Sequence, residues 1–267
     1  KKGNYENAIS PFKTAILLNP NLYKAYNNLG NALKGLGNFD QAIISYKKAL
    51  QISPNFSEAW NNLGIAFKYI DNIEEAINSY KTALRINPNY PEAYNNLGNI
   101  LQLKGKHEEA IDYYQKALGI KPEYAEAYNN LGTSQKQKGD LTEAIQSFQM
   151  ALKINKNEPD AHWNLAITQL YCGNYKSGWE NYEWRWKNIK AIKPHANPKI
   201  NKWEGEVLKL NEKLLIVSEQ GLGDTIQFMR YIPCLKEKKI DVSFCAQEKL
   251  HSLIKESKIV DKPLSPM

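Results

Sequence analysis

The chain has 267 residues, of which 42% are hydrophobic and 24% are charged, with 16 tyrosines and six tryptophans. This composition excludes an intrinsically disordered protein, and the length suggests one or two domains at about 150 residues each. The net charge of +7 is spread along the chain without a basic block, which indicates a lysine-rich surface and does not favour nucleic acid as a partner.

The dominant feature of the sequence is a six-residue motif that recurs every 34 residues. Ala-Tyr-Asn-Asn-Leu-Gly or a close variant occupies residues 25–30, 59–64, 93–98, 127–132 and 161–166. Apolar residues at helical spacing predict two amphipathic helices in each unit. In the first full unit Gly37-Asn38 predicts the turn between them, and small residues such as Gly30 and Ala42 allow close approach around Tyr46.

This pattern resembles the tetratricopeptide repeat (TPR) family. The resemblance implies an all-α superhelical solenoid over residues 1–187. The units are predicted at residues 1–22 (a partial repeat), 23–56, 57–90, 91–124, 125–158 and 159–187. Gly3 and Asn4 align with the turn of a repeat, so we expect the chain to enter midway through a unit, and Asp71 stands where other units have a turn glycine.

Asparagines recur on the first helix of each unit, which lines the concave face in this family. The first column is Asn27, Asn61, Asn95 and Asn129; the second is Asn28, Asn62, Asn96, Asn130 and Asn164; Asn31 and Asn99 lie one turn further on. A primary amide both donates and accepts hydrogen bonds, so these columns could hold the backbone of an extended peptide. The second column could equally bond between neighbouring helices, whereas the first favours binding.

The neutral columns also exclude one kind of partner. TPR domains that clamp a C-terminal carboxylate in chaperone adaptors use Lys or Arg where Asn27 and Asn61 stand, because a carboxylate needs a cation. A chaperone-tail adaptor is therefore not favoured. The columns are instead similar to those of the superhelix attached to protein O-linked N-acetylglucosamine transferases.

The last unit is loaded with aromatic residues, including Trp179 and the run Trp184-Arg185-Trp186. Such loading favours a terminal repeat that docks onto something other than a repeat, with a hydrophobic cap as the alternative. The run could stack on a sugar or a base, but packing within the last repeat is the favoured interpretation.

Beyond residue 187 the periodicity stops. Residues 188–212 read as a connector, and residues 213–267 as an incomplete α/β Rossmann-like segment. A buried parallel strand is expected at 213–217, a glycine loop at 218–224, a helix at 225–236, a second strand at 241–246 and a second helix at 248–256.

Residues 214–231 resemble the first strand, loop and helix of heptosyltransferase-like GT-B glycosyltransferases. The resemblance implies that Asp224 is the general base for an acceptor hydroxyl, with Gly221 and Gly223 allowing close approach of a sugar or phosphate and Glu219 nearby. The alternative is that Asp224 caps the following helix.

Two functions follow from these features. The first is a protein- or peptide-binding scaffold that presents partners to a glycosyltransferase-like domain, which is too short here to be active. The alternative is sugar transfer by a longer, full-length protein, which would need a nucleotide-sugar donor; no cofactor is expected in this chain. The four histidines share no ligand spacing with Cys172, Cys234 and Cys245, so no metal site is predicted. Without a membrane segment, secretory leader or disulfide framework, we expect a cytoplasmic protein.

Overall fold

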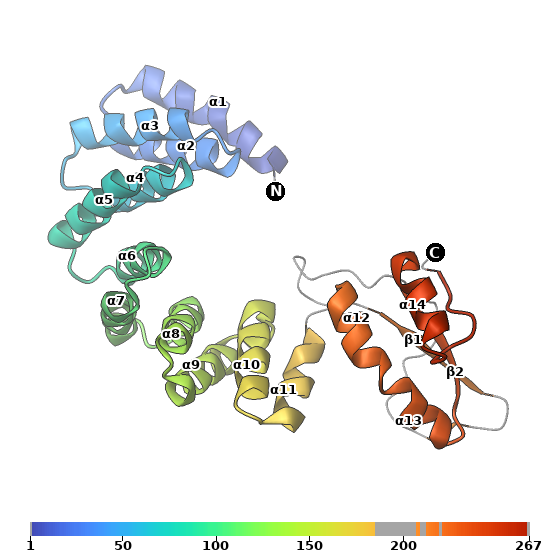
Figure 1. Cartoon of the computed structure of the whole chain (residues 1–267). Coiled ribbons are helices and arrows are strands. Elements are labelled where there is room, and N and C mark those ends of the chain that lie inside the picture. The colour runs from blue at the N-terminus through green and yellow to red at the C-terminus, as the bar shows by residue number, and fades with distance from the viewer. Residues whose placement is uncertain (1, 185–206, 209–211, 219–220, 266–267) are drawn as a thin grey trace. The chain divides into compact units, whose positions relative to one another are not determined.

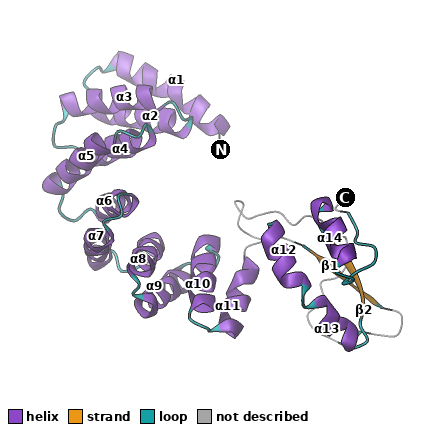
Figure 2. Cartoon of the chain, in the orientation of Figure 1, coloured by secondary structure: helices purple, strands orange, loops and turns teal. Residues whose placement is uncertain are grey.

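The computed structural model describes residues 2–184, 207–208, 212–218 and 221–265. The chain divides into two compact units, residues 1–185 and residues 186–267, and each is described by itself. The first unit is helical, and the second holds a small sheet with short helices (Figure 2).

The first unit consists of one leading helix followed by five helix pairs. Its helices are α1 Lys2–Leu18, α2 Tyr23–Gly35, α3 Phe39–Ile52, α4 Ser57–Tyr69, α5 Ile73–Ile86, α6 Pro91–Leu103, α7 His107–Ile120, α8 Ala125–Lys138, α9 Leu141–Ile154, α10 Pro159–Tyr171 and α11 Tyr175–Tyr182. Figure 1 shows them stacked in an arc, with α4, α6 and α8 along its inner side and α5, α7 and α9 along its outer side. The first helix of each pair therefore forms the inner layer, as expected for a TPR solenoid.

Four of the five pairs, from α2–α3 to α8–α9, are held together by an aromatic ring that packs against a glycine. Tyr46, Tyr80, Tyr114 and Phe148 on the second helices are fully buried. A Cβ atom added to the facing glycine would lie 2.5–2.7 Å from the nearest ring carbon in all four pairs, so only glycine allows this approach. The predicted packing of small residues around Tyr46 is confirmed and repeats along the array.

The turn within each pair needs a left-handed residue. Gly37, Gly105, Gly139 and Gly173 adopt φ between 72° and 98°, and Asp71 adopts φ of 60° at the equivalent place. A non-glycine residue in this region is strained, although aspartate tolerates it better than most. The turn expected at Gly3-Asn4 is absent, because α1 already begins at Lys2.

The second unit contains two parallel strands, β1 Lys213–Val217 and β2 Asp241–Cys245, paired in the register Lys213 to Asp241. Helices α12 Leu222–Met229 and α13 Ile232–Glu237 connect them, and a 3₁₀ turn Glu248–Leu250 leads into α14 His251–Glu256. The core gathers on β2 and α14, around Phe244 and Ile254. Among the described residues the sheet has two strands, so a Rossmann-like fold is not established.

Several expectations for this unit need correction. The strand expected to be buried, β1, is only half-buried beyond its exposed first residue. The helix expected at 225–236 begins at Leu222 and is interrupted at residues 230–231, where Ile232-Pro233 opens a new helix. The helix expected at 248–256 is part 3₁₀ turn and part α-helix.

Candidate functional site

The two asparagine columns bond to each other across successive repeats. From Asn62 onward, the amide Nδ2 of each second-column residue donates to the Oδ1 of the first-column residue one repeat earlier. These bonds are Asn62 to Asn27 (3.1 Å), Asn96 to Asn61 (3.0 Å), Asn130 to Asn95 (3.0 Å) and Asn164 to Asn129 (3.0 Å). The ladder thus ties neighbouring repeats together.

The first column is engaged further through its own amide groups. Asn27 donates to Glu58 at 3.0 Å, and Asn95 donates to Glu126 at 3.1 Å, in both cases reaching the next repeat. Burial raises the pKa of Tyr90 and of Tyr124, and the side chains of Asn61 and Asn95, respectively, offset part of this rise. Buried polar groups of this kind are hydrogen-bonded because an unpaired amide costs about 1–3 kcal/mol.

Burial divides the first column, the column expected to favour binding. Asn27, Asn61 and Asn95 are only 1%, 4% and 0% exposed, so their amides lie within the stacked helices, whereas Asn129 is half-buried. The adjacent column is mixed: Asn28 is exposed, Asn62 is buried, and Asn96, Asn130 and Asn164 are half-buried. The helical period alone does not separate the side of a helix that meets the next repeat from the side that meets a ligand.

Asn31 and Asn99 lie about one turn further along the inner helices than the first column, and both are half-buried. Their Oδ1 atoms lie 2.8 Å from the buried hydroxyls of Tyr46 and Tyr114, and the Tyr114 hydroxyl shares its one proton between Asn99 and Oε1 of Gln102, also at 2.8 Å. With Oδ1 turned toward the tyrosine, the Nδ2 group of each asparagine is the end available to another molecule. The corresponding residue in the unit between them is Ile65.

A row of cations on the same helices escaped the sequence analysis. Lys34, Lys68 and Lys136 are half-buried and stand seven residues after the first column, about two helical turns along one face. Burial lowers the pKa of Lys34 and of Lys136, and the nearby carboxylate of Glu58 partly offsets this effect at Lys34. Their spacing of 34 and then 68 residues, with Gln102 at the place between Lys68 and Lys136, is the signal that could have revealed them.

The terminal repeat packs part of its aromatic residues internally. Trp184 stacks on His162 with ring centroids 3.9 Å apart, in agreement with packing inside the last repeat, whereas Arg185 and Trp186 lie outside the described residues. Trp179 is 50% exposed, so docking of this repeat onto another body stays a prediction.

The C-terminal residues singled out from the sequence lie around the start of α12. Gly221 is the residue that caps this helix, and Gly223 and Asp224 lie within its first turn instead of in the preceding loop. The alternative in which Asp224 is the cap is therefore wrong. The side chain of Asp224 and all of Glu219 lie outside the described residues.

Three polar residues that sequence reasoning missed meet beside this turn. Gln247, just after β2, accepts hydrogen bonds from Ser218 at 3.3 Å and from Thr225 at 3.1 Å. Ser218 directly follows β1, so the cluster sits where both parallel strands end, the edge at which open α/β sheets bind ligands. Among the described residues no group of three or more His, Cys, Asp or Glu gathers, and no described helix is long and apolar enough to cross a bilayer.

Comparisons with known proteins agree with the helical array. Tetratricopeptide repeat family models match residues 1–37, 23–56, 45–78, 71–105 and 89–157, so the matched segments run without a gap from residue 1 to residue 157. The protein FlbA of Caulobacter vibrioides is 34% identical over 68 residues, which are 26% of this chain and 11% of FlbA. The chain thus spans about a tenth of that relative.

Two solved structures share the fold. PilF of Pseudomonas aeruginosa superimposes with a TM-score of 0.58 at 26% identity, covering 61% of this chain and 74% of PilF. MamA superimposes with a TM-score of 0.52 at 32% identity, covering 58% of this chain and 91% of MamA. With the 34-residue helix pairs and their glycine–aromatic core, these matches show that the chain belongs to the tetratricopeptide-repeat family.

Proposed function

We propose that the repeat array is a scaffold that binds an extended segment of another protein along the inner side of the arc. The observation that carries this proposal is the set of polar groups left over on the inner helices after the asparagine ladder has formed. Asn28 is exposed, and the amide groups of Asn31 and Asn99 are oriented by tyrosines behind them. Stacked repeats commonly use an extended concave surface of this kind for binding.

The contribution of the asparagines to binding is thus narrower than the sequence suggested. Asn27, Asn61 and Asn95 stabilise the array by joining repeats, and the remaining exposed amides offer donors to a peptide backbone. Such contacts hold a peptide without reading its side chains. Selectivity then has to come from other residues on the same side.

A peptide-display selection against the whole chain tests the proposal. We expect peptides that bind in isothermal titration calorimetry and lose about tenfold in affinity, the effect of 1.4 kcal/mol, when Asn28→Ala and Asn99→Asp are combined. Asn99→Asp keeps an oxygen for the hydroxyl of Tyr114 but removes the amide donor. The matched control combines Asn78→Ala and Gln115→Ala, two exposed residues on the outer helices. Selection of no binding peptide would refute the scaffold.

A second candidate, sugar transfer by a longer protein, is favoured by one observation in the second unit. The strand–helix–strand arrangement places Gly221 and the Ser218, Thr225 and Gln247 cluster at one edge of parallel strands. We propose Asp224 as the base there, with a nucleotide-sugar as donor. In a longer protein that transfers sugar, Asp224→Asn should abolish most transfer, and a variant that keeps its activity would remove Asp224 from the reaction.

A further inference from the structure

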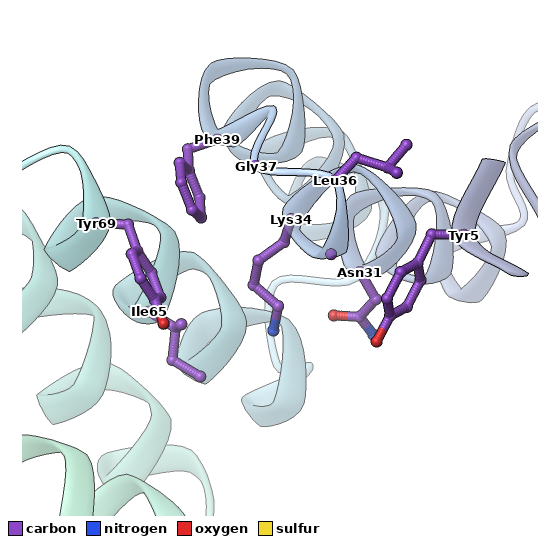
Figure 3. A pocket seen from close by; sticks show the side chains of 9 residues that line it. Tyr5, Asn31, Lys34, Leu36, Gly37, Phe39, Ile65 and Tyr69 are labelled. Atoms are coloured by element: carbon purple, nitrogen blue, oxygen red, sulfur yellow. The ribbon is translucent and has the colours of Figure 1, made fainter. Parts of the chain in front are cut away.

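A hollow on the inner side of the first repeats provides a site for a side chain of the bound segment, in addition to contacts with its backbone. It has a volume of about 520 Å³ and is lined by Tyr5, Asn31, Lys34, Gly35, Ile65 and Tyr69, among others; we call it the Lys34 hollow. Figure 3 shows the amine of Lys34 pointing between Asn31 and Tyr5 on one side and Ile65 and Tyr69 on the other. One cation thus projects into a space with partly apolar walls.

The hollow exists because one large side chain is missing from the repeat pattern. The residue at the end of the inner helix is Gly35 in the first full unit, but Tyr69 and Leu103 in the next two. Tyr69 stacks on Phe39 with centroids 4.6 Å apart, whereas Tyr5 lies directly against Gly35, where an added Cβ would be 2.7 Å from its ring. The ring of Tyr5 therefore occupies the space over Gly35 and forms one wall of the hollow, and Tyr69 lines it as well.

Two polar groups in the hollow present hydrogen-bond donors. The Oδ1 atom of Asn31 already accepts from Tyr46 at 2.8 Å, so its Nδ2 group is the free end. The Nζ atom of Lys34 donates to Asn62 through a long contact of 3.4 Å, which leaves further N–H groups of the ammonium for another acceptor. These two donors, one of them positively charged, stand beside the hydroxyl-bearing rings of Tyr5 and Tyr69 and fit an anionic acceptor.

The charge of Lys34 is not neutralised within the array. No carboxylate lies within 4 Å of its Nζ atom in the part of the chain that the structure describes. The nearby carboxylate, Glu58, is bonded to Asn27 instead. A half-buried ammonium without a carboxylate in direct contact gains more from an arriving anion than an exposed one, since water screens it less.

We propose that the Lys34 hollow binds the carboxylate of a glutamate or aspartate side chain in the segment held by the array, with Lys34 and Asn31 as the two donors. This inference rests on the proposed scaffold function and adds the chemistry of the partner, an acidic extended peptide. A carboxylate matches the single cation, whereas a phosphate carries up to two charges and is usually met by several cations. Tyr5, Ile65 and Tyr69 give its apolar stem and neighbours a surface.

The other two lysines of the row extend the preference for acidic residues along the array. Lys68 and Lys136 repeat the position of Lys34, so further acidic residues of one segment would meet cations in later repeats. Neither place has the same hollow: Ile65 replaces the asparagine beside Lys68, and Thr133 replaces it beside Lys136. The first repeat therefore fixes the register of the segment.

Fluorescence anisotropy with the whole chain tests the hollow. The probe is a fluorescein-labelled peptide with an amidated C-terminus and three glutamates separated by Tyr-Ser pairs; the comparison peptide has glutamines. We expect the glutamate peptide to bind about tenfold more tightly, with the difference decreasing as salt is added. Lys34→Gln should remove most of that preference, and the matched control Lys48→Gln, an exposed lysine of an outer helix, should leave it intact.

A second variant separates binding from folding. Gly35→Ala places a methyl group where the hollow meets Tyr5, and alanine in a helix is at least as favourable as glycine. Because Tyr5 is 40% exposed, its ring can shift to admit the methyl group, unlike the fully buried ring of Tyr114. We expect the helical circular dichroism to be kept with a melting temperature lowered by at most about 2–4 °C, and a loss of the glutamate preference similar to that of Lys34→Gln. Preference retained in both variants, tighter binding of a phosphoserine probe, or a need for a free C-terminal carboxylate would overturn the inference. Display-selected peptides that bind without acidic residues would overturn it and leave the scaffold standing, whereas binding by no peptide would overturn both.

Discussion

Removal of the hydroxyl group of Tyr80 should stabilise the array. Its ring is fully buried against Gly64, as in the neighbouring pairs, but its hydroxyl has no hydrogen-bond partner in the structure. The equivalent hydroxyl of Tyr114 donates to Asn99 at 2.8 Å, whereas the residue at that place in the Tyr80 unit is Ile65. Tyr80→Phe therefore removes an unsatisfied polar group, and Tyr114→Phe removes a satisfied one.

The two substitutions should have opposite signs. An unsatisfied buried hydroxyl costs about 1–3 kcal/mol, so Tyr80→Phe should raise the free energy of unfolding by about 1 kcal/mol or more. Tyr114→Phe should lower it by about 1 kcal/mol, the usual net value of one hydrogen bond. For an array of this size a change of 1 kcal/mol shifts the melting temperature by about 2–4 °C.

Thermal unfolding followed by far-ultraviolet circular dichroism measures both effects on the whole chain. Ile65→Asn provides a further check, because a partner for the hydroxyl should stabilise the parent and give a smaller gain in the Tyr80→Phe background. A double-mutant cycle isolates this coupling. Equal destabilisation by Tyr80→Phe and Tyr114→Phe would refute the reasoning.

Other predictions concern backbone strain, the ladder and the packed glycines. Asp71→Gly should raise the free energy of unfolding by about 0.5–1 kcal/mol, because it relieves a left-handed non-glycine residue; a lower melting temperature would contradict this. Asn95→Ala should lower it by about 1–3 kcal/mol, because it unpairs Glu126 and Asn130, both in the next repeat; denaturant unfolding with an unchanged midpoint would count against a structural ladder. Gly98→Ala should cost at least about 1–3 kcal/mol through overpacking against Tyr114, whereas Gly119→Ala, which meets open space, should be neutral or slightly stabilising in the same melts.

The repeat register could be predicted in detail because its determinants are local. The 34-residue recurrence, the turn glycines and the small residue opposite Tyr46 each restrict one step of the fold, and the helix pairs follow them closely. The role of Asn27 could not be predicted, because its burial depends on how far the next repeat rotates, which helical periodicity does not contain. The structure places its amide against Glu58 and Asn62, both in that next repeat.

The missed features have different causes. Lys34 reads as an ordinary solvated lysine, and its burial becomes visible only when Gly35 and Tyr5 are seen together in space. The unpaired hydroxyl of Tyr80 could have been predicted by aligning Ile65 with the asparagines of the flanking units. In the second unit, helix α12 begins before the residue that the glycine motif suggested, because Gly221 already serves as its cap.

The most direct test of the account is the side of the array on which a selected peptide lies. A photocrosslinking benzophenone residue at position 28 places the probe at an exposed site of an inner helix, and the same residue at position 48 places it on an outer helix. The account predicts that a display-selected peptide crosslinks strongly from position 28 and weakly from position 48. Strong crosslinking from position 48, with little from position 28, would contradict binding along the inner side.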